Sequence, residues 1–253
     1  MRLRMKKGKI TFGRWDPHEL DRMLAAARGL SGAGRRIEFL SRQFLDVPYK
    51  ESTLIGAEHT PEMFTINLDA VDCFTYLDYV EAMRRSSNFA TFKETLKTVR
   101  YRDGTVDYTS RNHFFTDWIE SNPFVRDVTA GVGQEKTRTV RKKLNERGDG
   151  TYVVSGIPPA NRVVTYIPGR AIDAGIVRRL RNGDYVGIYS PARGLDVSHV
   201  GIVIRVRGKV FLRHASSSSA HRMVIQEDFL NYVAGKPGIV VLRPEATARP
   251  SRR

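Results

Sequence analysis

The chain has 253 residues, 41% of them apolar, and a formal net charge of +15. This length and composition predict a globular protein with a sizeable core. No apolar run is long enough to span a bilayer, and the single cysteine excludes an internal disulfide. The surplus of positive charge indicates either a solvated basic surface or an anionic partner.

Residues 1–34 combine a basic segment with one predicted helix. Residues 1–7 are basic like the start of a secretory signal, but no apolar segment follows them. If the chain is not exported we expect it in the cytoplasm, and if a leader has been removed we expect it in the periplasm or cell envelope. Residues 16–28 have the pattern of a helix, with Asp16 as N-cap and Pro17 at its first position.

Four more helices are predicted before residue 122. They cover residues 35–45, the stretch around Cys73, residues 89–99 and residues 112–120. In the second of these, Asp69 is the predicted N-cap, which places Cys73 in the first turn or just beyond it. One apolar stripe is expected along that helix, formed by Val71, Phe74, Leu77, Val80 and Met83.

From about residue 151 the pattern changes to short strands rich in β-branched residues. Helices first and mostly antiparallel strands afterwards indicate an α+β fold. We expect residues 246–253 to form a basic tail. The expected strands cover residues 152–154, 163–167, 184–189, 200–206, 210–213 and 239–242, with a helix inserted over 171–180.

The cysteine and two distant histidines supply the parts of a cysteine hydrolase. A helix N-terminus favours negative charge, so Cys73 is expected to be biased toward thiolate. A hairpin turn at Arg207-Gly208 would put His214 opposite Gly201 and His199 on the same face. The histidines are then diagonal neighbours, about 7–8 Å apart at the backbone, whereas a slip of one residue would separate them. Gly201 is expected to leave space for the cysteine sulfur.

Each of these features also has an ordinary explanation. A lone cysteine on a helix is more often a small buried apolar residue. The segment Arg111–Trp118 has the composition of a carbohydrate or peptide site, but it fits equally well a helix capped by Asn112 that buries Phe115 and Trp118. The basic run Lys136–Lys143 is the best local support for nucleic-acid binding.

Two other classes of function have less support. No zinc-finger spacing and no RNP-like aromatic segment accompanies the basic residues, so nucleic acid is not the expected partner. No His-Glu-x-x-His motif occurs, and a single cysteine cannot build the usual thiolate cluster, so no catalytic metal is expected.

The cysteine helix, the later segment His199-Val-Gly-Ile and the segment His214-Ala-Ser together resemble the NlpC-type papain-like cysteine peptidases of bacterial cell walls. The resemblance implies a fold in which N-terminal helices, including the cysteine helix, pack on a mostly antiparallel sheet or partly closed barrel. It also implies a single hydrolase domain over residues 35–245, with an insertion around 87–180 because the interval from cysteine to histidine is long.

Four segments narrow the resemblance to the N-acetylmuramoyl-L-alanine amidase-like branch, over most of residues 35–243. They are Phe44–Tyr49, Val71–Thr75, Tyr101–Gly104 and Arg111–Trp118. One departure is Phe74, which stands where a small residue is commoner. The branch implies cleavage of the amide between N-acetylmuramic acid and L-alanine in peptidoglycan or its fragments, by a monomer that needs no cofactor.

The resemblance also assigns roles to residues. Cys73 would attack the carbonyl, His199 would accept the thiol proton and His214 would orient the imidazole. The expected substrate contacts are Asp72, Tyr101, Arg102, Asn112 and His113. Two alternatives stay open: a γ-D-glutamyl–diamino acid endopeptidase with the same triad, and a non-catalytic wall- or nucleic-acid-binding protein that has kept the fold.

Overall fold

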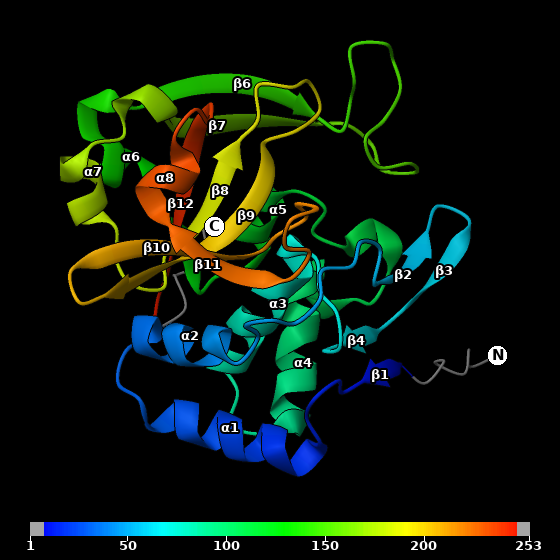
Figure 1. The fold of residues 1–253 in the computed structure, drawn as a ribbon. Helices are drawn as coiled ribbons and strands as arrows, with labels where there is room; N and C mark the ends of the chain where they lie inside the picture. The colour runs from blue at the N-terminus through cyan, green and yellow to red at the C-terminus, as the bar shows by residue number, and fades with distance from the viewer. Residues whose placement is uncertain (1–7, 247–253) are drawn as a thin grey trace.

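The computed structural model describes residues 8–246, so the basic segment 1–7 and nearly all of the predicted tail lie outside the described residues. Within this range eight α-helices and one large sheet form the chain (Figure 1). The helices are α1 (Pro17–Gly29), α2 (Ala33–Arg42), α3 (Cys73–Arg84), α4 (Phe89–Arg100), α5 (Phe115–Ser121), α6 (Thr129–Gly133), α7 (Ala174–Arg179) and α8 (Phe229–Val233).

The large sheet has eight strands, and all of its pairs are antiparallel. Its order is β11-β10-β9-β8-β12-β7-β6, with β5 also paired to β12. The strands are β5 (Val125–Asp127), β6 (Arg138–Leu144), β7 (Ala160–Pro168), β8 (Tyr185–Tyr189), β9 (Val197–Val206), β10 (Lys209–Ala215), β11 (Val224–Asp228) and β12 (Gly238–Pro244).

Two small sheets complete the topology. Strand β1 (Lys9–Thr11) runs parallel to β4 (Thr65–Asn67), and β2 (Ile55–Ala57) is antiparallel to β3 (Thr60–Met63). The prediction of an α+β fold with a mostly antiparallel sheet is therefore confirmed. The part of the chain that the structure describes has an open strand path and no closed barrel.

Both faces of the large sheet are covered. Along β9, Val200 and Ile202 point into a larger core shared with α1 to α4, whereas Val203 points into a second core with Phe229 of α8 and Ile176 of α7. In Figure 1, α1 to α4 lie below the sheet and α6 to α8 lie beside its upper part. The alternation of side chains along β9 thus separates the face toward α3 from the face toward α8.

Several predicted elements differ from the observed ones. Residues 152–154 form no strand, because Tyr152 makes only an isolated bridge with Glu146. The basic run Lys136–Lys143 is largely strand β6, an edge strand of the sheet on which charged side chains discourage pairing with other chains. Strand β11 was not expected from the sequence, although it borders β10 along its whole length.

Helix α3 is buried nearly all round, so the expected single apolar stripe is wrong. Every residue from Thr75 to Arg84 is buried, including Asp78, Glu81 and Arg84. These charges are paired: Asp78 accepts from Arg100 at 2.9 Å, and Glu81 accepts from Arg84 at 2.6 Å. The ion pairs let a polar sequence pass through the centre of the molecule, since a buried unpaired charge would be prohibitive.

Candidate active site

Asp72, and not Asp69, is the N-cap of α3. Its Oδ1 accepts hydrogen bonds from the backbone N–H groups of Phe74 at 2.9 Å and Thr75 at 2.7 Å, and the Thr75 hydroxyl accepts from the backbone N–H of Asp72. Val71 cannot be helical, because it is bridged to Tyr49 and its N–H donates to the Pro48 carbonyl. This tertiary contact makes Cys73 the first residue of the helix.

The cysteine thiol is neutral in this setting. Cys73 is partly buried, and burial raises the pKa of its thiol to about 12, with a further rise from the Asp72 carboxylate. Hydrogen bonding from the backbone of Val200, and from Cys73 and Phe74 at the helix end, lowers the pKa by less. The expected bias toward thiolate is therefore wrong, since desolvation and a neighbouring anion outweigh the helix terminus.

The hairpin that carries the histidines has the predicted register. Val206 pairs with Lys209 across the Arg207-Gly208 turn, and Ile202 pairs with Arg213, which sets His214 across from Gly201. The backbone ladder of β9 with β10 ends at that last pair. Beyond it the side chains meet, with Nε2 of His199 2.7 Å from Nδ1 of His214 and the ring planes at 89°.

The space beside Gly201 is used differently from the prediction. A Cβ at this glycine would lie 2.9 Å from a methyl group of Leu212 and 3.0 Å from Cβ of His214. Strand β10 therefore fills the space that was expected to admit the cysteine sulfur. Gly201 acts by allowing His214 to approach β9 closely.

A carboxylate extends the histidine pair. Oε2 of Glu227, on β11, lies 2.8 Å from Nε2 of His214. A carboxylate only accepts, so Nε2 of His214 carries a proton, and in the neutral ring Nδ1 is then an acceptor. His199 must therefore donate through Nε2, which leaves its Nδ1 free to accept a proton.

Both histidines are held in the neutral form. Burial, followed by His214 and Lys236, lowers the pKa of His199 to about 3. Burial also lowers the pKa of His214, although Glu227 opposes this shift. At neutral pH these side chains therefore hold a thiol and uncharged imidazoles rather than a thiolate–imidazolium pair.

Tyr232 of α8 lies beside the two histidines of the site. Its ring centroid lies 4.8 Å from that of His214 and 6.2 Å from that of His199. Its pKa is raised by burial and then by the charges of Glu227 and Cys73, so the tyrosine lies near both of these side chains. Sequence reasoning missed Tyr232 and Glu227, because Val224–Asp228 has two apolar residues followed by three polar ones and lacks the alternation that marks a strand.

Two further segments lie near the start of the cysteine helix: the loop that carries Tyr49, and helix α5. Burial and then the charge of Cys73 raise the pKa of Tyr49 to about 12. The ring of Phe74 packs edge-on against Trp118 of α5, with ring centroids 6.3 Å apart. The start of α5 is in turn bound to the residue preceding β9, because Asp196 accepts from the N–H and hydroxyl of Thr116 at 2.7 and 2.9 Å.

The four predicted substrate contacts on residues 101–113 are hydrogen-bonded to other protein groups. Tyr101 is fully buried and its hydroxyl donates to Glu62 at 2.6 Å, and Asn112 is buried with its amide donating to the Val99 carbonyl at 3.0 Å. Arg102 is exposed and donates to the Thr109 carbonyl, while His113 contacts the Tyr108 carbonyl at 2.9 Å. Among residues 8–246, none of these four hydrogen-bonds to Cys73, His199 or His214.

The two interpretations of Arg111–Trp118 are resolved in part. Phe115 and Trp118 are buried, as expected for a helix that packs inward. The helix begins at Phe115, so Asn112 is not its cap. His113 is only partly exposed, and burial lowers its pKa to about 4.

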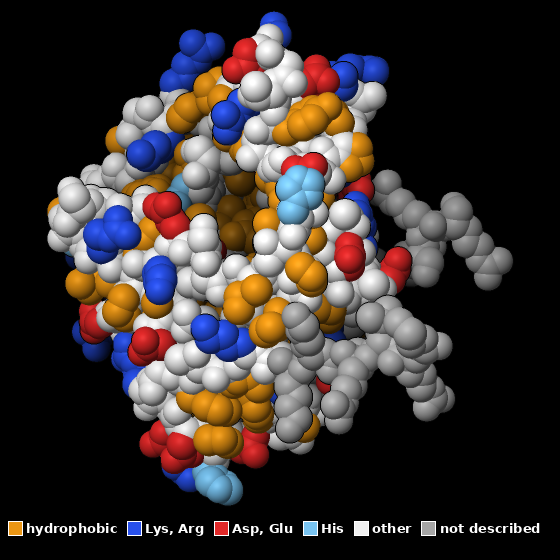
Figure 2. Space-filling model, turned by 90° about the vertical axis from the view of Figure 1, so that its right-hand side faces the viewer, with side chains coloured by type: hydrophobic (Ala, Val, Ile, Leu, Met, Phe, Trp, Pro, Cys, Tyr) orange, Lys and Arg blue, Asp and Glu red, His pale blue; other side chains and the backbone are white. Residues whose placement is uncertain are grey.

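The surface carries a deep depression. Figure 2 views the molecule from the side on which β2, β3 and the connection between β6 and β7 project in Figure 1, and it shows a hollow with hydrophobic side chains at its floor. A concave site with an apolar floor suits a ligand of limited size.

Over the described range, no three His, Cys, Asp or Glu side chains are grouped so that they could hold a metal ion. No helix in this range is long and apolar enough to cross a membrane.

Comparisons with known proteins show which family and which solved structures the chain is similar to. An N-acetylmuramoyl-L-alanine amidase from Bacteroides uniformis matches with 29% identity over 84% of this chain and 99% of its own, at a TM-score of 0.69. A Legionella pneumophila protein of 20% identity shares the fold, with a TM-score of 0.76 over 92% of this chain and 95% of its own. A comparison with curated proteins gave no match. The model of the family described as AmiA-like, N-acetylmuramoyl-L-alanine amidase-like, matches residues 39–239. The chain therefore belongs to the N-acetylmuramoyl-L-alanine amidase-like family.

Proposed function

We propose that this protein is a cell-wall hydrolase that cleaves the amide between N-acetylmuramic acid and L-alanine, in peptidoglycan or in its fragments. The observation that carries the proposal is the hydrogen-bonded chain His199–His214–Glu227, which starts beside the residue whose backbone binds the Cys73 thiol. Membership of the amidase-like family and the name of the Bacteroides uniformis relative support the choice of bond.

In the proposed reaction Cys73 is the nucleophile and His199 is the base. As the sulfur attacks the amide carbonyl, Nδ1 of His199 accepts the thiol proton, and His214 with Glu227 stabilises the imidazolium that forms. The imidazolium returns the proton to the nitrogen of L-alanine, which leaves as an amine. The muramoyl thioester is then hydrolysed by water, whose proton passes through His199 and restores the thiol.

The end of α3 supplies the remaining element. The backbone N–H of Cys73 lies at the helix N-terminus, where no earlier turn of the helix can accept it. We propose that this N–H donates to the oxyanion that forms during attack. The same arrangement of helix, histidine strand and orienting residue supports the proposed relation to the NlpC-type papain-like peptidases.

The predicted substrate contacts divide into two groups. Asp72 caps the nucleophile helix, and Tyr101 and Asn112 are buried with their polar atoms paired, so we propose that these three act by holding the walls of the site. Arg102 is exposed and His113 is partly exposed, so these two stay proposed as direct contacts.

A digest of defined muropeptides tests the proposal. Mass spectrometry should show release of an intact stem peptide that begins with L-alanine, whereas products that retain L-alanine on muramic acid would indicate the endopeptidase instead. Cys73→Ala and His199→Ala should each abolish turnover while the circular dichroism spectrum is unchanged. Unchanged turnover of Cys73→Ala would exclude cysteine catalysis, and inactivation by a chelator but not by a thiol alkylator would indicate a metal enzyme.

A further inference from the structure

A pocket of about 360 Å³ lies where β6, β7 and the connection from α8 to β12 meet, and no carboxylate lines it. Three cationic side chains line it: Arg138 of β6, Arg170 of the turn Gly169–Ala171, and Lys236. Arg138 also lines the adjoining pocket of about 380 Å³ together with Arg170. Three elements far apart in the sequence thus deliver positive charge to one concave surface.

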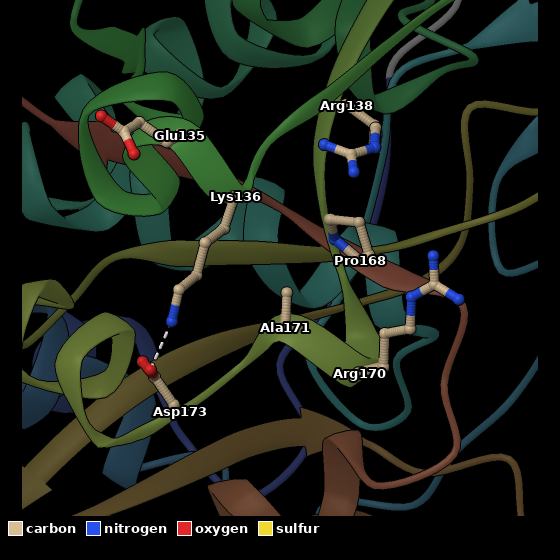
Figure 3. Close-up of a pocket in the computed structure, with 7 residues that line it drawn as sticks. All are labelled: Glu135, Lys136, Arg138, Pro168, Arg170, Ala171 and Asp173. Carbon is tan, nitrogen blue, oxygen red and sulfur yellow. Dashed lines mark hydrogen bonds and ion pairs between the residues drawn. The ribbon is translucent and has the colours of Figure 1, made fainter.

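These cations have no acidic partners among residues 8–246. The only hydrogen bond of the Arg138 guanidinium is to the Thr137 carbonyl at 3.0 Å, and neither Arg170 nor Lys236 forms an ion pair. A neighbouring cation behaves differently, because Lys136 is paired with Asp173 across the adjoining pocket, as the dashed line in Figure 3 marks. In the same view Arg138 and Arg170 flank Pro168, away from that acidic residue.

The protection of a sheet edge does not account for this cluster. Edge strands often carry charged residues, which explains Arg138 on β6. Arg170 and Lys236 are not on an edge strand, and like charges that share a pocket repel one another. An anion bound among the three would remove that repulsion and form charge-assisted hydrogen bonds with the guanidinium groups.

The cluster adjoins the candidate active site. The ammonium of Lys236 lies 5.3 Å from the ring centroid of Tyr232, and that ring in turn lies 4.8 Å from the ring of His214. The charge of Lys236 also lowers the pKa of both His199 and His214. Tyr232 therefore lies between the histidine pair and one of the three cations, so a substrate that spans both regions would pass this ring.

The geometry points to a subsite in which Arg138, Arg170 and Lys236 bind a free carboxylate of the stem peptide, an inference that rests on the proposed function. The carboxylate is an oxyanion carried by the substrate itself, at a distance from the bond that is cut. The subsite would select stem peptides with free carboxylates over those whose carboxylates are amidated.

The experiment compares two muropeptides that differ only in amidation of the stem carboxylates. For the double variant Arg138→Gln/Arg170→Gln, KM should rise about tenfold for the free acid and stay unchanged for the amide. Arg138→Lys/Arg170→Lys should recover part of the loss, because it keeps the charge. The matched control is Arg178→Gln/Lys209→Gln, which removes two exposed cations outside the pocket and should leave both KM values unchanged.

Binding gives a readout that is independent of turnover. Calorimetry with the Cys73→Ala protein should show tighter binding of the free acid than of the amide, and this preference should vanish when Arg138 and Arg170 are replaced as well. Inorganic phosphate should compete with the free acid if the pocket accepts any oxyanion, and failure of phosphate to compete would assign the preference to carboxylate alone.

The remaining outcomes distinguish failure of the carboxylate subsite from failure of the proposed cysteine catalysis. Equal KM increases for both muropeptides, or no increase for either while Cys73→Ala is inactive, would refute the subsite and leave the amidase proposal in place. Full turnover by Cys73→Ala would refute the catalytic proposal. In that case equal affinity for the free acid and the amide in the calorimetry would refute the subsite too.

Discussion

Nε2 of His199 lies 2.7 Å from Nδ1 of His214, across a hairpin whose turn is the two residues Arg207-Gly208. The Glu227 carboxylate fixes the proton on the far side of His214, so the contact between the rings has only one polarity for neutral side chains. Nδ1 of His199 is thereby left as the acceptor nitrogen of its ring. The predictions below test this arrangement and its surroundings.

The first prediction concerns the reactivity of Cys73, which is the only cysteine, so total thiol labelling reports on it alone. The thiolate is the species that reacts, and burial raises the pKa of this thiol to about 12. Alkylation by iodoacetamide should therefore be slow at pH 7 and should accelerate about tenfold per pH unit up to at least pH 9. A rate that is already constant between pH 6 and 8 would instead show a preformed thiolate–imidazolium pair.

The second prediction separates the two effects of Asp72. Asp72→Asn keeps a side chain that caps the helix but removes the charge that raises the pKa of Cys73, so alkylation at pH 8 should be several-fold faster. Asp72→Ala also loses the cap and should lower the free energy of unfolding by about 1 kcal/mol. Asp69→Asn is the control, since this residue does not cap α3, and it should change neither quantity.

The third prediction concerns Glu227, a positioning residue in the proposed reaction. Glu227→Ala removes the acceptor for Nε2 of His214 and should lower kcat about tenfold, while KM stays unchanged because Glu227 contacts the histidine and not the substrate. Glu227→Gln retains an acceptor oxygen and should recover part of the loss. Glu94→Gln serves as the control on an exposed acidic residue, and a rise in KM for Glu227→Ala would argue for direct substrate contact instead.

The fourth prediction is that stability falls in mild acid. Burial lowers the pKa of His199 to about 3 and that of His113 to about 4, both below the value of about 6.5 in an unfolded chain. The unfolded state therefore binds more protons below pH 6.5, so the stabilising contribution of each neutral ring is complete above pH 6.5 and is lost as the pH falls toward the folded pKa. At pH 5 each histidine should cost about 2 kcal/mol relative to pH 7.

Urea unfolding at pH 5 and pH 7 measures this difference. His199→Asn and His113→Asn should each reduce the loss between the two pH values by about their own share. The exposed His59 provides the control, because His59→Asn should leave the loss as it is in the unmodified protein. An equal loss in all three variants would assign the acid sensitivity to other groups.

The fifth prediction concerns the close approach at Gly201. Gly201→Ala would place a Cβ 2.9 Å from Leu212 and 3.0 Å from Cβ of His214, and overpacking of this kind costs about 1–3 kcal/mol. Because His214 is one of the displaced groups, kcat should also fall. Gly29→Ala, whose Cβ would meet nothing within 4 Å, should leave stability and kcat at least as high as before.

Local chemistry explains which elements could be predicted. The helix at Pro17–Gly29 has the predicted Asp16 cap and its capping box with Glu19, because all of these contacts are within four residues. The histidine hairpin has the predicted register because a two-residue turn leaves few alternatives. The helix cap and the hairpin turn both depend only on residues that are close together in the sequence.

The errors arose where distant contacts decide the structure. Two aspartates precede Cys73, and the choice between them depends on the bridge from Val71 to Tyr49, which no local pattern reveals. The strand at Arg138–Leu144 is so rich in basic residues that it resembles a solvated segment. Glu227 and Tyr232 join the site only because β11 and α8 fold back over the hairpin, so their roles could not be inferred from spacing.

The burial of α3 has a consequence for how the enzyme would adapt to new substrates. With residues 75–84 enclosed and only its first turn partly exposed, the helix cannot tilt or slide without disturbing the larger core that surrounds it. The sulfur of Cys73, the proposed nucleophile, is thus held at a fixed position in the molecule. Evolution of specificity would have to proceed by rebuilding the loops and cationic side chains around that point, and sequence variation among relatives should concentrate there.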